Sequence, residues 1–385
     1  MTTIPAPLPF ALPDIGEAEI QAVADAMRSG WVSSGPRVKT FEDAFAEALG
    51  GGIEAVALNS ATAGLHLALE ACGVGPGDEV LVPTWTFTAT AEVVRYLGAE
   101  PVLVDIEADT LNIDFDDAKR RLTDRTRAIM PVHMAGHPIS HDAISSFAQA
   151  FALDVVEDAA HAFPASDAGV AVGAGLSRAA VFSFYATKTI TTGEGGMVVT
   201  RDPELAARIR VMRLHGISRD TFDRYRATVP SWQYSVEAPG YKYNLTDPAA
   251  AMGLIQLERA EEMRARRERI ARRYDEGLEG LPLDLPVKPT HDVVHSRHLY
   301  IVRTLSGFDR DTVIEKLADL GIGTSVHFIP LHMQPYWRER GRLAASDFPV
   351  ATAEAGRVIS LPIFSRMSDA DVDRVVAAVR AVLAV

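Results

Sequence analysis

The sequence predicts an α/β protein with a mostly parallel sheet, helices on both faces of that sheet, and a smaller α+β domain after it. The first observation behind this prediction is a series of short apolar runs between residues 55 and 200. The second is that amphipathic helical patterns separate these runs, which is typical of parallel strands buried on both faces. The third is that this alternation ends before residue 280, where a different pattern begins.

The expected elements follow one another in a simple order. The seven expected strands are Ala55–Leu58, Glu79–Val82, Pro101–Ile106, Ala128–Val132, Leu153–Val156, Ala179–Phe184 and Gly196–Thr200. The helices expected between them are Thr62–Cys72, Ala89–Leu97, Asp114–Leu122, Ser140–Phe151 and Pro203–Leu214. Beyond them we expect one long helix, Asp247–Leu278, in whose first turn a proline is tolerated. The expected elements of the small domain are the strands His298–Thr304 and Gly323–Phe328 and the helices Asp309–Leu320 and Asp369–Leu383. We predict a large domain, 1–255, with an N-terminal arm, and a small C-terminal domain, 256–385.

Composition is that of an ordinary globular protein and disfavours several functions. Hydrophobic residues make up 48% of the 385 residues and charged residues 23%. The net charge of −13 disfavours binding to nucleic acid or to a membrane, because an acidic surface repels phosphate groups. No stretch approaches the roughly 18 apolar residues that span a bilayer, and the segment Met1–Pro13 lacks the basic start of a signal peptide. Cys72 is the single cysteine, so we expect no disulfide, no cysteine-rich metal site and a cytoplasmic location.

Groups that suit an anion follow the first expected strand. The segment Asn59–Gly64 opens a helix, and the unpaired backbone N–H groups at a helix N-terminus attract phosphate. Thr62 adds a hydroxyl donor. An ordinary Ser/Thr N-cap without a ligand is the alternative, and this segment taken alone favours it.

A carboxylate follows the strand that ends at Val156. It belongs to Asp158, in the segment Glu157–His161. At the end of a buried strand, this carboxylate could hold a protonated ring nitrogen such as that of a pyridinium cofactor. A structural N-cap explains the same residue equally well.

A lysine follows the strand that ends at Phe184. Lys188 lies just beyond this strand and precedes the glycine-rich segment Thr192–Gly196. A lone lysine is normally solvated, but burial would lower the pKa of its amine and make the amine nucleophilic. Ligands of open α/β sheets bind at the carboxyl ends of the strands, so the lysine, the carboxylate and the helix start would meet there. Together the three groups predict a pyridoxal 5'-phosphate site with Lys188 as its catalytic residue.

Several motifs along the chain carry a family resemblance. They are Gly30–Pro36, Asn59–Ala63, Val156–His161, Phe182–Lys188, Gly240–Asp247 and Ser360–Pro362. With these motifs the chain resembles, from about Leu8 to Val382, the DegT/DnrJ/EryC/StrS family of sugar aminotransferases. The family has the aspartate-aminotransferase-like fold type I of pyridoxal phosphate enzymes. Within it, the UDP-4-amino-4-deoxy-L-arabinose aminotransferase group is the most similar.

The resemblance implies cofactor-binding roles for the matching residues. Lys188 would hold the cofactor as a Schiff base and carry protons during catalysis. Asp158 would bind the pyridine nitrogen, and His161 would donate to the phenolic oxygen. The phosphate would be held by Ala61, Thr62, Ser183 and, from the neighbouring subunit, Asn244.

The resemblance also implies an aromatic contact and substrate contacts. Phe87 would stack on the cofactor ring, and Trp85 is the second choice, since packing between loops explains it as well. Trp31, Tyr185 and His327 would contact the substrate. A structural role for His327 is equally compatible with its position.

The implied reaction has two half-reactions. L-Glutamate would give up its amino group and leave as 2-oxoglutarate, and a nucleotide-linked keto-sugar would receive the group, in a ping-pong mechanism. The enzyme would be a homodimer with shared active sites. His161 and Asn244 favour amination at C4, and a C3-aminating sugar or cyclitol aminotransferase is the alternative.

Two other functions, one of a relative and one from a different class of protein, fit the sequence less well. A related sugar dehydratase would have histidine in place of Lys188. A non-catalytic regulator that binds the cofactor would need a DNA-binding helix-turn-helix and a basic face, whereas this chain is acidic.

Two patterns that suggest other ligands are discounted. The segment Gly73–Asp78 resembles a dinucleotide-binding loop, but it follows a helix and precedes a strand, so we expect a turn. His133, His137 and His141 are spaced like metal ligands on a helix, but Pro138 would break that helix. We therefore expect no metal site.

Overall fold

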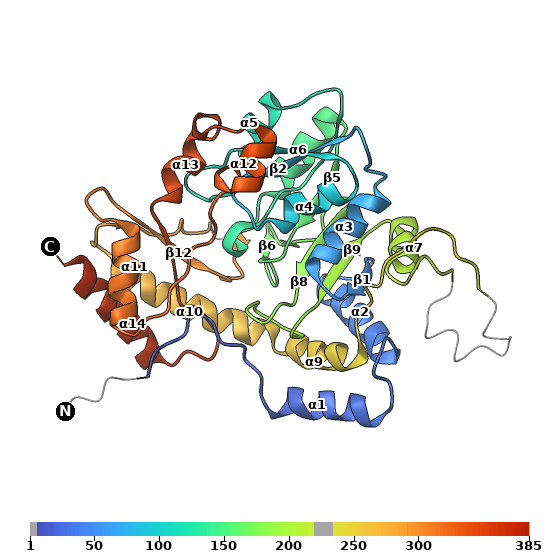
Figure 1. Cartoon of the computed structure of the whole chain (residues 1–385). Helices are drawn as coiled ribbons and strands as arrows, with labels where there is room; N and C mark the ends of the chain where they lie inside the picture. The colour runs from blue at the N-terminus through green and yellow to red at the C-terminus, as the bar shows by residue number, and fades with distance from the viewer. Residues whose placement is uncertain (1–5, 219–233, 291, 385) are drawn as a thin grey trace.

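A seven-stranded sheet forms the centre of the protein (Figure 1). The computed structural model describes residues 6–218, 234–290 and 292–384. The sheet has the strand order β1-β9-β8-β5-β4-β2-β3. Its strands are β1 (Glu54–Leu58), β2 (Glu79–Pro83), β3 (Glu100–Val104), β4 (Thr126–Ile129), β5 (Asp154–Asp158), β8 (Ala179–Ser183) and β9 (Gly196–Thr200). Strand β9 runs antiparallel to both of its neighbours and the other pairs are parallel, so the predicted strands and the mostly parallel sheet are confirmed.

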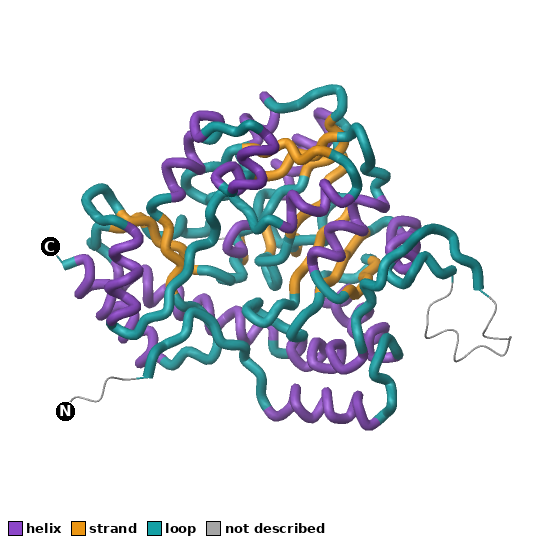
Figure 2. Tube along the Cα trace, viewed as in Figure 1, coloured by secondary structure: helices purple, strands orange, loops and turns teal. Residues whose placement is uncertain are grey.

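Helices enclose this sheet, as Figure 2 shows. They are α2 (Pro36–Ala48), α3 (Ala61–Ala71), α4 (Ala89–Tyr96), α5 (Phe115–Arg120), α6 (His141–Phe151), α7 (Pro203–Met212) and α9 (Asp247–Glu258), and α1 (Glu17–Arg28) lies outside them and packs against α9. The predicted helices between the strands are confirmed, whereas α1 and α2 were not predicted. No helix within the described ranges is long and apolar enough to cross a bilayer.

Side chains on the two faces of the sheet belong to separate hydrophobic cores. On β8, Val181 packs into one core and the adjacent Phe182 into the other, because successive side chains of a strand point to opposite faces. Helix α3 lies very close to the sheet at Gly64, where an added Cβ would be 2.6 Å from Cγ1 of Val181. The missing side chain thus lets the helix that begins after β1 pack directly on β8.

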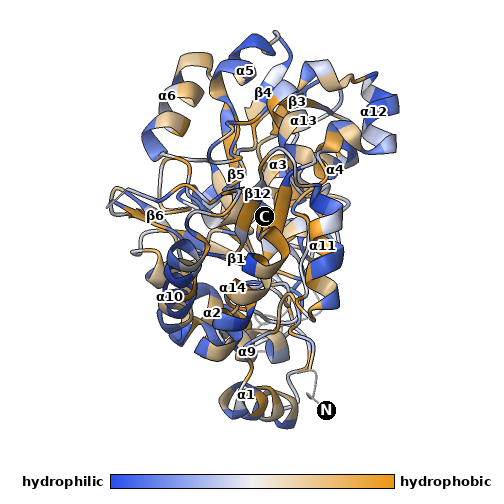
Figure 3. Cartoon of the chain, turned by 90° about the vertical axis from the view of Figure 1, so that its left-hand side faces the viewer, coloured by the Kyte–Doolittle hydropathy of each residue, from blue (hydrophilic) through white to orange (hydrophobic). Residues whose placement is uncertain are grey.

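A second, antiparallel sheet and its helices form the C-terminal part. The sheet consists of β10 (Leu283–Asp284), β12 (Tyr300–Thr304) and β13 (Val358–Leu361), and the helices are α10 (Ala260–Leu278), α11 (Arg310–Asp319) and α14 (Asp369–Leu383). They share a hydrophobic core that includes Tyr274, Tyr300 and Ile359. Figure 3 shows the hydrophilic faces of α10 and α11 on the outside of this part. The domain division at residue 255 stays a prediction.

Two predictions about this part were wrong. The long helix expected from Asp247 to Leu278 is broken at Arg259, whose ψ of −1° departs from helical geometry. Its guanidinium binds Asp14 and Glu19, which explains the break by a tertiary contact. The expected strand Gly323–Phe328 forms only an isolated bridge between Ser325 and Ser360, because its end turns towards the central sheet.

The segment after residue 328 returns to the large sheet. It contains α12 (Pro335–Gly341) and α13 (Pro349–Ala355), which Figure 1 shows in the upper part of the molecule, where β2 also lies. The backbone N–H of Leu331 donates to the carbonyl of Thr84 at 2.7 Å. The carboxylate of Asp105 accepts hydrogen bonds from the backbone N–H groups of Val350 and Ala351, both at 2.9 Å. These bonds hold the segment between Leu331 and Ala351 against the carboxyl ends of β2 and β3.

A small third sheet lies beside the central one. It consists of β6 (Ser166–Asp167), β7 (Val170–Ala171) and β11 (Val293–Val294), all antiparallel. Strand β11 pairs with β6, which follows β5 in the chain, and residues 295–299 come directly after β11. The third sheet therefore brings residues 295–299 close to the end of β5.

Candidate active site

A cavity of about 470 Å³ lies at the carboxyl ends of β5 and β8. Ends of parallel strands are where ligands of open α/β sheets bind. Most of the site residues predicted from the sequence line it: Ala61, Thr62, Phe87, Asp158, His161, Ser183, Tyr185, Lys188 and His327. Other lining residues, not predicted, include Glu194, His298 and Phe328.

The N-terminus of α3 forms one side of the cavity. Ser60 caps the helix by accepting a hydrogen bond from the backbone N–H of Ala63 at 3.1 Å. The predicted N-cap is therefore present, and the helix start that it caps faces the cavity through Ala61 and Thr62. An added Cβ at Gly196 would lie 2.6 Å from the nitrogen of Ala61, so only glycine lets β9 start this close to α3. Free N–H groups at this position suit a phosphate.

Asp158 ends β5 and turns its carboxylate into the cavity. Its Oδ2 accepts a hydrogen bond from Oγ1 of Thr90 at 2.8 Å, and its Oδ1 accepts one from the backbone N–H of Ala160 at 3.1 Å. Burial raises the pKa of the carboxyl group above its ordinary value, and these bonds and the charge of Lys188 oppose that rise. Such a group favours a partner that brings its own proton and positive charge, as a pyridinium does.

Lys188 projects into the cavity from the turn after β8. Its backbone N–H donates to the carbonyl of Tyr185 at 2.9 Å, which closes that turn. Burial lowers the pKa of the amine to about 8; Asp158 opposes this effect and Arg267 adds to it. The amine therefore loses its proton near pH 8 instead of near pH 10.5, which favours its action as a nucleophile or a base.

Three histidines surround the amine of Lys188. His161 and His298 have ring centroids 4.4 Å apart, and His327 lines the same cavity. Burial, and then the charge of Lys188, keeps the pKa values of His161 and His298 well below the ordinary value, and the same causes lower the pKa of His327 to about 4. His298 was missed in the sequence because it stands at the start of an expected strand, where nothing marks it as a site residue.

The choice between the two aromatic candidates is clear from their burial. Phe87 lines the cavity with 58% of its surface exposed, whereas Trp85 is fully buried. The indole of Trp85 donates to the carbonyl of His327 at 3.0 Å, so this ring packs between loops. Phe87 is thus the ring available to stack on a ligand, and its ring lies 6.0 Å from that of Phe328.

Two predicted residues, Trp31 and Asn244, are not among the residues that line the cavity of their own chain. Trp31 packs near Gly35, where an added Cβ would lie 2.7 Å from the indole. The side-chain amide of Asn244 donates to Oγ of Ser34 at 2.7 Å. Trp31 therefore does not line the cavity of its own chain, and the predicted contact of Asn244 with the phosphate in the neighbouring subunit stays a prediction.

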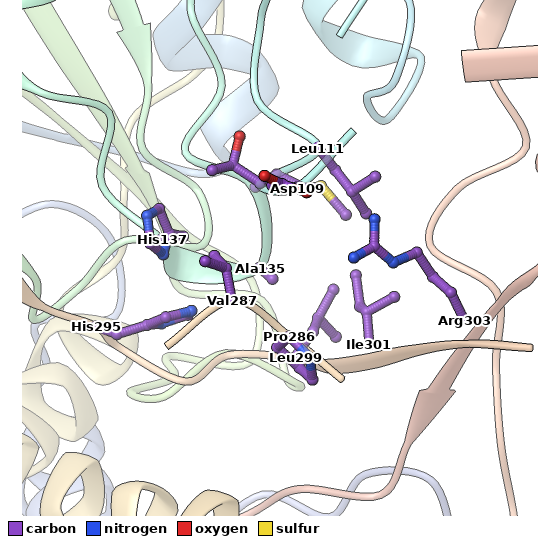
Figure 4. Close-up of a pocket in the computed structure, with 12 residues that line it drawn as sticks. Asp109, Leu111, Ala135, His137, Pro286, Val287, His295, Leu299, Ile301 and Arg303 are labelled. Carbon is purple, nitrogen blue, oxygen red and sulfur yellow. The ribbon is translucent and has the colours of Figure 1, made fainter. Parts of the chain in front are cut away.

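The three histidines considered as metal ligands, His133, His137 and His141, have different surroundings in the structure. His133 binds Glu157, with 2.7 Å between Nε2 and Oε2, and His141 contacts the carbonyl of Val170. His137 lines a separate cavity of about 40 Å³ together with His295, Asp109 and Arg303 (Figure 4). In the parts of the chain described above, no three acidic, histidine or cysteine side chains are grouped as metal ligands.

The residues of the main cavity fit pyridoxal phosphate. A helix N-terminus for the phosphate, a carboxylate for the ring nitrogen and a lysine for the aldehyde carbon all line one space. In addition, Nδ1 of His161 is buried and has no hydrogen-bond partner among the described residues, so it can serve the phenolic oxygen. A single small ligand with these groups would satisfy all of them.

Comparison with known proteins places this site in a family. Residues 13–380 match the DegT/DnrJ/EryC1/StrS aminotransferase family. The chain belongs to this family. One relative, the spore coat polysaccharide biosynthesis protein SpsC of Bacillus subtilis (strain 168), is 46% identical over 377 residues, which cover 97% of this chain and 96% of SpsC.

Solved structures agree with the assignment to this aminotransferase family. Spr1654 from Streptococcus pneumoniae, in its PMP-form, has a TM-score of 0.91 and 36% identity, and the match covers 97% of this chain and 98% of that one. The sugar aminotransferase CalS13 from Micromonospora echinospora has a TM-score of 0.86 and 30% identity over 97% of this chain and 99% of its own. Spr1654 has also been solved in a PLP-form. The protein is a pyridoxal-phosphate-dependent aminotransferase of fold type I from a family of sugar aminotransferases.

Proposed function

We propose that this enzyme transfers the amino group of L-glutamate to C4 of a nucleotide-linked keto-sugar by a ping-pong mechanism. The observation that carries the proposal is the cavity in which Lys188, Asp158 and the start of α3 meet. A lysine whose pKa is lowered to about 8 and a buried carboxylate that lines the same cavity suit amino transfer.

Each side chain of the site has its own role in this reaction. Bound pyridoxal phosphate supplies a conjugated ring that accepts the electron pair of a breaking C–H bond. The neutral amine of Lys188 takes the proton from the carbon of L-glutamate that bears the amino group, and in the second half-reaction it delivers a proton to the sugar carbon that receives nitrogen. Asp158 keeps the ring nitrogen protonated, and Thr90 orients the carboxylate. Phe87 would stack on that ring.

Several observations support a nucleotide-linked keto-sugar as the proposed acceptor. SpsC is named for polysaccharide biosynthesis, and polysaccharides are assembled from activated sugars, which favours a nucleotide-linked substrate. His161 and Asn244 match the C4-aminating group of the family, and the resemblance to the UDP-4-amino-4-deoxy-L-arabinose aminotransferase group points the same way. A C3-aminating sugar or cyclitol aminotransferase is the alternative.

We also propose that the enzyme is a homodimer with shared active sites. Asn244 lies close to the end of β1, through a bridge with Leu58, yet it does not line its own cavity. A two-fold dimer would let each Asn244 reach the phosphate in the partner's cavity. The cytoplasmic location expected from the single cysteine stays a prediction.

Separating the two half-reactions tests the proposed function. L-Glutamate alone is added to the purified holoenzyme, and we expect the absorbance of the bound cofactor to change while one equivalent of 2-oxoglutarate is released per site. Panels of UDP-, dTDP- and GDP-linked 4-keto and 3-keto sugars, and a keto-cyclitol, are then supplied, and the aminated carbon is located by NMR. Amination at C3 or of the cyclitol only would contradict the proposed acceptor. Failure of every amino donor to change the spectrum would contradict the proposed roles of the cavity residues.

A further inference from the structure

His298 makes a contact with the reacting lysine that the proposed mechanism does not yet use. Its Nε2 lies 3.5 Å from Nζ of Lys188, although the two residues are 110 positions apart in the chain. The ring is buried, with 5% of its surface exposed, and it lines the catalytic cavity. Its other nitrogen, Nδ1, has no hydrogen-bond partner among the described residues. Within the described part of the chain, Lys188 is thus the one side chain at hydrogen-bond distance from this imidazole.

The chain around His298 is fixed by buried hydrogen bonds. The guanidinium of Arg267 on α10 is buried and donates to the carbonyls of Arg297 and His298, both at 3.3 Å, and of Ile363 at 2.8 Å. The hydroxyl of Ser296 donates to the carbonyl of His161 at 2.5 Å. Among the described residues its hydrogen-bond partners are all carbonyl groups, which is unusual for a buried cation. Here the guanidinium holds the backbone of His298 in place.

The charges around His298 keep its ring neutral. The titratable groups that face it are Lys188, His161, His327 and Arg267, and Asp158 lies beyond Lys188. Burial comes first and the nearby positive charges follow in lowering the pKa of His298. A neutral imidazole has one nitrogen with a proton and one that accepts. Below its pKa of about 8 the amine of Lys188 is mostly an ammonium group, which has three N–H donors and no acceptor, so the accepting nitrogen of the imidazole is the one that faces it.

We propose that His298 is a further catalytic residue: its Nε2 accepts a hydrogen bond from the amine of Lys188, orients that amine and stabilises it each time it has taken up a proton. No proton moves to His298 in this role. A hydrogen bond from an ammonium group is stronger than one from a neutral amine. His298 therefore makes Lys188 a stronger base and opposes the effects of burial and of Arg267 on the amine.

The test measures Lys188 directly in the cofactor-free enzyme, so that it depends on no sugar substrate. The rate at which acetic anhydride acetylates Lys188 is followed by mass spectrometry between pH 6 and 10. We compare the wild type with His298→Phe, which removes the acceptor, and His298→Gln, whose amide oxygen can accept from the same direction. The control is His137→Phe, because His137 also has a buried, unpaired Nδ1 but lines the separate cavity of Figure 4.

We expect the wild type to show a midpoint near pH 8. His298→Phe should lower that midpoint by about one pH unit and reduce turnover of the loaded enzyme roughly 10- to 100-fold. His298→Gln should recover most of both losses, and His137→Phe should match the wild type. An unchanged midpoint in His298→Phe, or equal effects of phenylalanine and glutamine, would overturn the inference.

An NMR measurement on the wild-type enzyme tests the inference even if the variants do not fold. In ¹⁵N-histidine-labelled enzyme, the resonances of His298, assigned by their loss in His298→Gln or, failing that, through the neighbouring backbone, report which nitrogen carries the proton. We expect the proton on Nδ1, and a proton on Nε2 would overturn the inference. The inference rests on the role proposed for Lys188. If Lys188→Ala keeps its turnover, the proposed function of that lysine fails, whatever the acetylation midpoints are.

Discussion

Thr90 and Asp158 form a buried hydrogen bond of 2.8 Å that joins the start of α4 to the end of β5. The hydroxyl of Thr90 also lies 2.8 Å from that of Thr86, so a short chain of hydroxyl groups leads to the carboxylate. Hydrogen bonds to the charged form of an acid lower its pKa. The threonine therefore helps Asp158 to stay ionised at a site where burial favours protonation.

The first prediction concerns Thr90→Val, which removes this hydroxyl and keeps the shape of the side chain. The pKa of Asp158 should rise further, so the affinity for pyridoxal phosphate should fall about 3- to 10-fold at neutral pH, as expected for one lost hydrogen bond. As pH is lowered, the acid-side loss of binding should begin at a higher pH than in the wild type. Absorbance titration of the cofactor-free enzyme measures both effects. Thr88→Val is the control, because the hydroxyl of Thr88 donates to Glu92 instead.

The second prediction concerns the charge of Asp158 itself. In Asp158→Asn the side chain is neutral at every pH and cannot favour a protonated ring nitrogen. We expect weaker cofactor binding and turnover reduced by roughly 100-fold or more. Asp154→Asn, at the opposite end of the same strand, should keep the wild-type values. A rate for Asp158→Asn within threefold of the wild type would show that the carboxylate does not serve the ring nitrogen.

The third prediction separates the catalytic and structural effects of Lys188. Lys188→Ala should reduce turnover to below about one thousandth, because the same amine acts as nucleophile and base. In the cofactor-free fold, the pKa of this amine is about 8, below its ordinary value of 10.5. Between these two values the unfolded chain binds more protons, so the lysine's unfavourable effect on stability is complete below pH 8 and is relieved as pH rises towards 10.5.

Thermal unfolding of the two cofactor-free proteins checks this sign. At pH 7, Lys188→Ala should melt at the same temperature as the wild type or at a higher one, and the difference should shrink above pH 8. Lys242→Ala, at an exposed lysine, is the control and should show no such trend. A wild type that is more stable than Lys188→Ala at pH 7 would contradict the unfavourable burial of the amine.

The sequence predicts those parts of the site that follow a strand directly. Asp158 and Lys188 were found because parallel strands that end at the same edge bring the next residues together. His298 contacts Lys188 and Thr90 contacts Asp158 from 110 and 68 positions away in the chain, and one sequence carries no signal for such pairs. The break at Arg259 was missed for the same reason, since its cause is a contact with the N-terminal arm.

The last prediction tests whether two chains share each site. The amide of Asn244 is hydrogen-bonded to Ser34, and the residue does not line the active-site cavity of its own chain. In the proposed dimer it therefore contacts the phosphate bound by the partner. Lys188→Ala and Asn244→Ala should each be nearly inactive alone. In a mixed dimer, one site carries both changes and the other carries neither, so mixing under conditions of subunit exchange should restore up to about a quarter of wild-type activity, since half of the dimers are mixed and each has one intact site. Exchange is verified with a mass-tagged subunit, and mixing each variant with itself is the control. If verified exchange restores no activity, or if sedimentation finds a fully active monomer, the proposal that Asn244 acts across a two-fold interface is wrong.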